Sequence, residues 1–160
     1  MNSKISTTRG IAYAAVIAAM YTALSLLFQA ISFGPLQFRI SEALTLLPMI
    51  TPYSIPGLIV GCFLSNLLGG YGIYDVIFGT LATAIAALLT YYFRKNKWIA
   101  VLPPIVVNAV IVGLVLTYFY NIPLLHMNIL TVGIGQAGVC YAIGLPLISL
   151  LKKVYSKKVS

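Results

Sequence analysis

Long apolar stretches separated by short polar breaks dominate this chain of 160 residues. We expect helices that span a membrane, because a stretch of about 20 apolar residues matches the thickness of a bilayer. The expected spans cover residues 10–31, 39–50, 55–69, 74–93, 98–119 and 128–151. The pattern therefore predicts an all-α fold, an integral membrane bundle of six transmembrane helices in a single domain over residues 1–160.

Glycines and prolines mark the breaks between these spans. Gly34 and Pro35 follow the first span, and the stretch MITPYSIPG precedes the third. The second span is short, at roughly 18 Å for an α-helix that rises 1.5 Å per residue. GGYGIYD and NIPLLHMN form later breaks, and we expect the only histidine, His126, to be a solvated residue of the last loop.

The composition supports a membrane protein and excludes several kinds of site. Hydrophobic residues make up 61% of the chain and charged residues 8%, too few to cover a soluble domain. Only two residues are acidic, so a multi-carboxylate metal site is not expected, and no bound cofactor is implied. The chain has no HExxH and no P-loop motif, and GIGQAG lies inside an apolar span without the strand that a dinucleotide site needs.

The cations predict the orientation of the helices. They form three clusters: Lys4 with Arg9; Arg94, Lys95 and Lys97; and Lys152, Lys153, Lys157 and Lys158. Six spans place all three clusters on one side, whereas five would leave one cluster outside. Under the positive-inside rule the N- and C-termini are then cytoplasmic. Clusters beside apolar spans indicate topology in a lipid bilayer, and we expect no nucleic-acid binding.

The same topology brings the rare charged residues to one external face. It places three external segments at residues 34–42, 69–75 and 121–128. Arg39, both acids (Glu42 and Asp75) and His126 belong to these segments, and we expect water to reach Arg39 and Glu42 there.

A small set of polar residues within or near the spans forms the candidate binding site. Such side chains usually face a bundle interior or a cavity, because lipid cannot satisfy them. The polar candidates are Arg39, Glu42, Asn66, Asp75, Asn108 and Gln136, walled by Phe38, Tyr71, Tyr74 and Tyr118. Simpler alternatives stay open: Arg39 and Glu42 pair with each other, the amides only join helices, and the tyrosines belong to an interfacial belt.

Small residues recur at a spacing of four, which lets helix backbones approach closely. Examples are Ala14 with Ala18, Gly57 with Gly61, and Ala15 with Ala19 and Ala23. The usual role of such residues is packing within one protein. The first span carries them on two adjoining faces, and a second role is docking of a partner helix in the membrane.

Two segments of the chain resemble a known family. RISEAL at residues 39–44 and NLLGGYGIYD at residues 66–75 are similar to the QueT family of queuosine-precursor transporters, and the resemblance extends more loosely along the chain. These proteins are substrate-binding S components of bacterial energy-coupling factor (ECF) transporters. The resemblance implies an ECF S-component-like bundle in the bacterial plasma membrane.

The resemblance also implies a ligand and partners. The ligand is a 7-deazaguanine such as preQ1, preQ0 or queuine, captured from outside. The partners are a transmembrane T subunit, docked on Ala15, Ala19 and Ala23, and two ATPase subunits. Glu42 or Asp75 would accept the two adjacent donors of the guanine-like edge, and the other acid would orient the ligand or meet its amine.

With such a ligand, Arg39 or an amide would donate to the ring oxygen, and we expect Arg39 to hold Glu42 in place rather than touch the ligand. From their position in the sequence, residues 32–37 are the expected external gate. On this view the chain is a transporter subunit and no enzyme. The alternatives are an S component for another vitamin-like solute, an integral membrane enzyme and an assembly protein.

Overall fold

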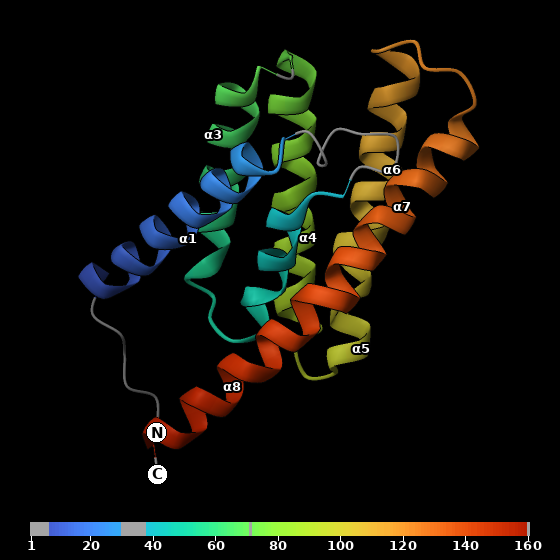
Figure 1. Cartoon of the computed structure of the whole chain (residues 1–160). Coiled ribbons are helices and arrows are strands. Elements are labelled where there is room, and N and C mark those ends of the chain that lie inside the picture. The colour runs from blue at the N-terminus through green and yellow to red at the C-terminus, as the bar shows by residue number, and fades with distance from the viewer. Residues whose placement is uncertain (1–6, 30–37, 71, 160) are drawn as a thin grey trace.

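A computed structural model of the chain describes residues 7–29, 38–70 and 72–159. These residues form six helical segments and no β-strand (Figure 1). The segments are α1 (Thr7–Leu27); η1 (Ile40–Met49); α3 (Ser54–Gly69); η2 (Asp75–Gly79) with α4 (Thr80–Tyr92); α5 (Lys97–Ala100) with α6 (Leu102–Tyr118); and α7 (Leu125–Val139), η3 (Cys140–Gly144) and α8 (Leu145–Val159). The predicted all-α membrane bundle is confirmed.

Four of these segments are long and apolar enough to cross a membrane. They cover Thr7–Leu27, Asp75–Tyr92, Lys97–Tyr118 and Leu125–Val154. The helices Ile40–Met49 and Ser54–Gly69 are also apolar but shorter. This multi-pass protein therefore combines full-length spans with two shorter helices. The cytoplasmic placement of both termini stays a prediction of the positive-inside rule.

The second helix differs most from an ordinary span. η1 winds as a 3₁₀ helix of ten residues and contains Pro48. The residues that follow it turn immediately into α3, whose first turn includes Pro56. A segment this short ends inside the bundle, and Figure 1 shows η1 between α1 and α4. The short second helix is thus an internal element, with eight of its ten residues buried.

The last helix begins earlier than we expected and ends later. α7 starts at Leu125, because the chain reverses at Leu124 in a left-handed conformation (φ 69°). His126 therefore lies in the first turn of α7, and its expected place in a loop was wrong, although its side chain is exposed. The helical run continues to Val159, eight residues beyond the expected end at residue 151.

Small residues set the distance between α1 and α3. A Cβ atom added to Gly57 would lie 2.5 Å from the backbone oxygen of Ala14, and one added to Gly61 would lie 2.9 Å from that of Ala18. The two backbones therefore touch along this face, as small residues at a spacing of four allow. Ala15, Ala19 and Ala23 lie on the other face of α1 and are exposed.

Candidate functional site

Glu42 is the centre of a polar cluster inside the bundle. Its side chain is 1% exposed. The hydroxyl of Tyr21 on α1 donates a hydrogen bond to Oε1. The side-chain amides of Asn108 on α6 and Gln136 on α7 each donate to Oε2 over 3.2 Å. One carboxylate of η1 thus joins three other helices, and all three donors come from neutral groups.

A second chain of contacts runs from Arg39 to Asp75. Nη2 of Arg39 donates to Oδ1 of Asn66 over 3.0 Å, and Nδ2 of Asn66 donates to the backbone oxygen of Asp75 over 3.0 Å. Asn66 is fully buried on α3. The guanidinium of Arg39 also lies within electrostatic range of Glu42 and Asp75. One cation thus interacts with both acids of the chain.

The position of Arg39 and Glu42 corrects our expectation that water reaches them at an external face. Arg39 is 6% exposed and Glu42 is 1% exposed, so both lie inside the bundle. The physical reason is that η1 runs through the interior. Burial of charge is tolerated where opposite charge and hydrogen bonds compensate for lost water. Here Tyr21, Asn66, Asn108 and Gln136 supply these hydrogen bonds.

Asp75 lies at the outer edge of the cluster, on the widened turn η2. Its side chain is 9% exposed, and the hydroxyl of Tyr120 donates a hydrogen bond to Oδ2. Partial burial and the neighbouring Asp75 carboxylate raise the pKa of Tyr120 above its usual range, so this hydroxyl keeps its proton. A Cβ atom on Gly72 (φ 100°) would lie 2.6 Å from the Tyr120 oxygen, so the chain before η2 approaches this tyrosine closely.

Tyr120, which donates to Asp75, belongs to a cluster of aromatic side chains. The ring of Tyr74 stacks on Phe119 with centroids 4.2 Å apart, and Phe78 stacks on the same ring at 5.4 Å. Tyr74 also meets Tyr120 edge to face at 6.4 Å. These contacts join the start of η2 to the end of α6. They form one aromatic wall that includes Tyr74, whose role in a binding site stays a prediction.

The other aromatic candidates lie apart from the acids or outside the described residues. Phe38 packs against α7, where a Cβ atom on Gly138 would lie 2.9 Å from its ring. Tyr118 is 65% exposed and lines an outer groove with Leu81 and Ile111, so its expected place in the pocket wall was wrong. Tyr71 and the expected gate, residues 32–37, lie outside the described residues.

Sequence reasoning missed several members of the cluster. Tyr21 is fully buried, and a hydroxyl in the middle of an alanine-rich span was a signal that could have identified it. Cys62 accepts hydrogen bonds from Asn66 (3.4 Å) and Thr83 (3.2 Å). No signal in the sequence pointed to Tyr120, which lies just after a span among other aromatic residues.

The groups of this polar cluster are suited to binding a ligand through hydrogen bonds. It offers two carboxylates as acceptors, amides that donate and accept, and one guanidinium. Aromatic rings stand at its outer edge. A small, flat, polar molecule with several hydrogen-bonding groups matches such a site best.

Comparison with known proteins identifies the family. The family model described as "QueT transporter" matches residues 11–153. A protein of Lactococcus lactis subsp. cremoris (strain MG1363), named queuosine precursor transporter QueT, is 38% identical over 84 residues. This match covers 51% of the chain and 49% of the relative, so it spans about half of each protein. No solved structure matches the chain significantly. Because the family model covers most of its length, this chain belongs to the QueT transporter family.

Proposed function

We propose that the protein is the substrate-binding S component of an ECF importer and captures a 7-deazaguanine from the external side. The observation that carries this proposal is the buried Glu42 carboxylate, held by Tyr21, Asn108 and Gln136 in a chain with only two acids. Family membership and the printed name of the Lactococcus relative support the same class of ligand.

Glu42 is the acid that we assign to the guanine-like edge. Every 7-deazaguanine presents a ring N–H beside an amino group, and a carboxylate accepts both in a charge-assisted pair. Oε2 of Glu42 already accepts two amide N–H groups, so one amide has to move when the ligand enters. The ring oxygen of the ligand then accepts from that amide. The displaced amide keeps a hydrogen-bond partner in this exchange, so no buried polar group is left unpaired.

Asp75 is the acid that we assign to the substituent of the ligand. Substituents of 7-deazaguanines differ in size, and the larger ones have to extend toward the outer edge of the site. Asp75 lies at that edge beside the aromatic wall of Tyr74 and Phe119. The aminomethyl group of preQ1 is cationic and would pair with this carboxylate, whereas the nitrile of preQ0 is neutral.

Replacing Asp75 by asparagine tests this division of roles. We expect Asp75→Asn to weaken binding of preQ1 by roughly tenfold to a hundredfold, because a charged hydrogen bond is lost, and to change preQ0 binding much less. Titration of both ligands into the purified protein measures the two affinities. An equal loss for preQ1 and preQ0 would contradict the assignment of Asp75 to the substituent.

Energy for import would come from partner subunits. The chain has no P-loop motif, so ATP hydrolysis requires separate ATPases, coupled through a transmembrane T subunit. The exposed alanines of α1 (Ala15, Ala19 and Ala23) offer a smooth face on which a T-subunit helix packs closely. The inward face of α1 already packs against α3, which leaves the alanine stripe for the partner.

A bulky side chain introduced into this alanine stripe tests partner docking independently of ligand binding. We expect Ala19→Trp to prevent co-purification with the T subunit and the ATPases while preQ1 affinity stays unchanged. Val106→Trp on α6 is the matched control, because Val106 is 55% exposed. Complex formation by the Ala19→Trp protein at the level of this control would rule out docking through the stripe.

Mass spectrometry of the small molecules that co-purify with the protein tests the function as a whole. We expect one 7-deazaguanine per chain, displaced by added preQ1 or queuine. A bound flavin or thiamine would contradict the proposed substrate but would remain consistent with an ECF S component. A protein that binds none of these ligands would not be the proposed S component.

A further inference from the structure

Asp75 is held from two sides. Nδ2 of Asn66 on α3 donates a hydrogen bond to its backbone oxygen over 3.0 Å. The hydroxyl of Tyr120, just beyond the end of α6, donates to Oδ2 of its side chain. Partial burial and the Asp75 carboxylate raise the pKa of Tyr120 above its usual range, so the hydroxyl has a proton to donate. Asn66 thus fixes the backbone of Asp75, and Tyr120 fixes its carboxylate.

The backbone after α6 keeps Tyr120 in place. Its amide N–H donates to the backbone oxygen of Val115 over 3.3 Å. The next residue, Asn121, adopts a left-handed conformation (φ 54°), which asparagine accepts more readily than most residues. The ring of Tyr120 meets Tyr74 edge to face at 6.4 Å, at the start of η2. The hydroxyl is therefore presented to Asp75 by a defined turn of the chain.

The segment before η2 leaves room for this hydroxyl only because residue 72 is a glycine. A Cβ atom on Gly72 would lie 2.6 Å from the hydroxyl oxygen of Tyr120. A larger residue would push the hydroxyl away from Asp75. The side chain of Tyr120 is nevertheless 37% exposed, so it reaches the outer edge of the polar cluster.

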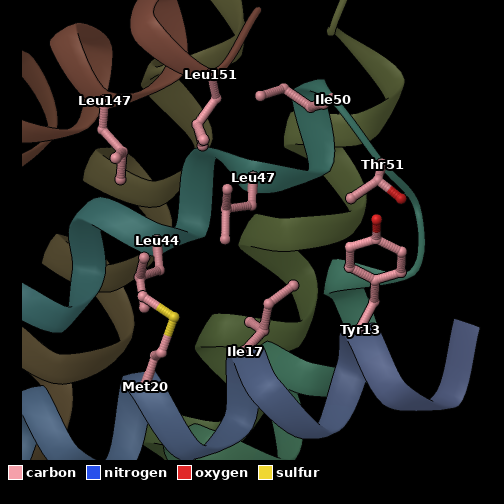
Figure 2. A pocket seen from close by; sticks show the side chains of 9 residues that line it. All are labelled: Tyr13, Ile17, Met20, Leu44, Leu47, Ile50, Thr51, Leu147 and Leu151. Carbon is pink, nitrogen blue, oxygen red and sulfur yellow. The ribbon is translucent and has the colours of Figure 1, made fainter. Parts of the chain in front are cut away.

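A cationic group on a ligand needs a carboxylate, and the chain has only two acids. The apolar groove between α1, η1 and α8 supplies none: Figure 2 shows side chains such as Ile17, Leu44 and Leu147 along it, and the described residues that line it carry no charge. Glu42 is assigned above to the guanine-like edge. The geometry of Asp75 therefore decides how a cationic substituent is received.

We propose that Tyr120 is a positioning residue that makes the site selective for a cationic substituent. Its hydroxyl occupies Oδ2 of Asp75 and leaves Oδ1 to accept from the incoming ammonium group. A carboxylate that is already oriented loses less conformational entropy when the ligand binds, so its pairing with the cation is stronger. A neutral nitrile gains nothing from this arrangement. The role rests on the function proposed above, in which Asp75 meets the substituent.

Tyr120→Phe removes the hydroxyl and keeps the ring. We expect this variant to bind preQ1 roughly tenfold more weakly and to change its affinity for preQ0 much less, as titration of both ligands would measure. Tyr118→Phe is the matched control, because it removes a hydroxyl two residues earlier from a ring that is 65% exposed. It should keep both affinities. Equal losses of preQ1 and preQ0 affinity in Tyr120→Phe, or an unchanged preQ1 affinity, would overturn the proposal.

A double variant tests whether Tyr120 acts through Asp75. If it does, adding Tyr120→Phe to Asp75→Asn should weaken preQ1 binding no further than Asp75→Asn alone, because the charge that the hydroxyl positions is already gone. Independent action, by direct contact with the ligand or through the fold, would instead multiply the two losses. Multiplied losses would thus contradict the positioning role.

Two glycines allow the hydroxyl to be displaced without being removed. Gly72→Ala should shift it from Asp75 and lower the preference for preQ1 over preQ0, as Tyr120→Phe does. Gly70→Ala is the control for backbone strain, since Gly70 also has a positive φ (70°) but a Cβ atom there would meet nothing within 4 Å. We expect Gly70→Ala to keep the preference. An equal change of preference in both glycine variants would argue against the hydroxyl.

The wild-type protein and Glu42→Gln separate this inference from the function on which it rests. A wild-type protein that binds neither preQ1 nor preQ0 would overturn both. A wild-type protein that binds the two ligands, with both affinities lost in Glu42→Gln and both kept in Tyr120→Phe, would overturn only the role of Tyr120. Thermal melts of each variant distinguish loss of binding from loss of the fold.

Discussion

Glu42→Gln is expected to lose 7-deazaguanine binding by roughly a hundredfold or more, for preQ0 and preQ1 alike. The neutral amide offers one acceptor in place of two, so one donor of the guanine-like edge stays unpaired, at a cost of about 1–3 kcal/mol or more when charge is involved. Titration of each ligand into the purified variant measures the loss. A loss for both ligands distinguishes Glu42 from Asp75, whose replacement should affect mainly preQ1.

The fold is expected to tolerate this change. Glutamine has nearly the shape of glutamate, its oxygen still accepts from Asn108 and Gln136, and its amino group can donate to the Tyr21 oxygen. Thr90→Val is a matched control, because Thr90 is a fully buried donor to Ala100 (3.2 Å) outside the site. We expect this control to keep its ligand affinity. Wild-type affinity in the Glu42→Gln protein would remove Glu42 from the proposed site.

Gly57→Ala is expected to destabilise the bundle, although alanine is the better helix former. Its Cβ atom would lie 2.5 Å from the backbone oxygen of Ala14 and 3.0 Å from the Cβ atom of Ile17. Backbone has to move to make room, and such overpacking costs about 1–3 kcal/mol. A thermal melt in detergent should show a midpoint that is lower by roughly 3 to 10 °C.

The same substitution at Gly133 provides the control for this experiment. A Cβ atom there would make only an ordinary contact, 3.4 Å from the Cβ atom of Ala109. We expect Gly133→Ala to leave the melting midpoint unchanged or to raise it slightly, because alanine favours the helix. Equal midpoints for the two variants would mean that close α1–α3 contact is not needed for stability.

The sequence singled out some residues of the polar cluster, but neither all of its members nor their arrangement. Polar side chains are energetically unfavourable in lipid, which singled out Glu42, Asn108 and Gln136 in the sequence. In the structure both amides donate to Glu42. Arg39 and Asp75 stood out in the same way, yet their link through Asn66 was not predictable. An aromatic ring such as that of Phe38 suits a pocket wall, but tertiary packing decides which ring faces a ligand. In the structure Phe38 packs against α7.

The sequence by itself determined the class of the protein and its helices. Apolar length and the cost of exposing backbone to lipid allow few structures other than a helical bundle, so the all-α membrane bundle followed from the pattern alone. Only the tertiary structure decided that Glu42 is buried and which groups meet it. Its partners Tyr21, Asn108 and Gln136 are 21, 66 and 94 residues away along the chain. No local periodicity encodes such contacts, because they depend on how closely the helices approach, and small residues such as Gly57 and Gly61 set that distance.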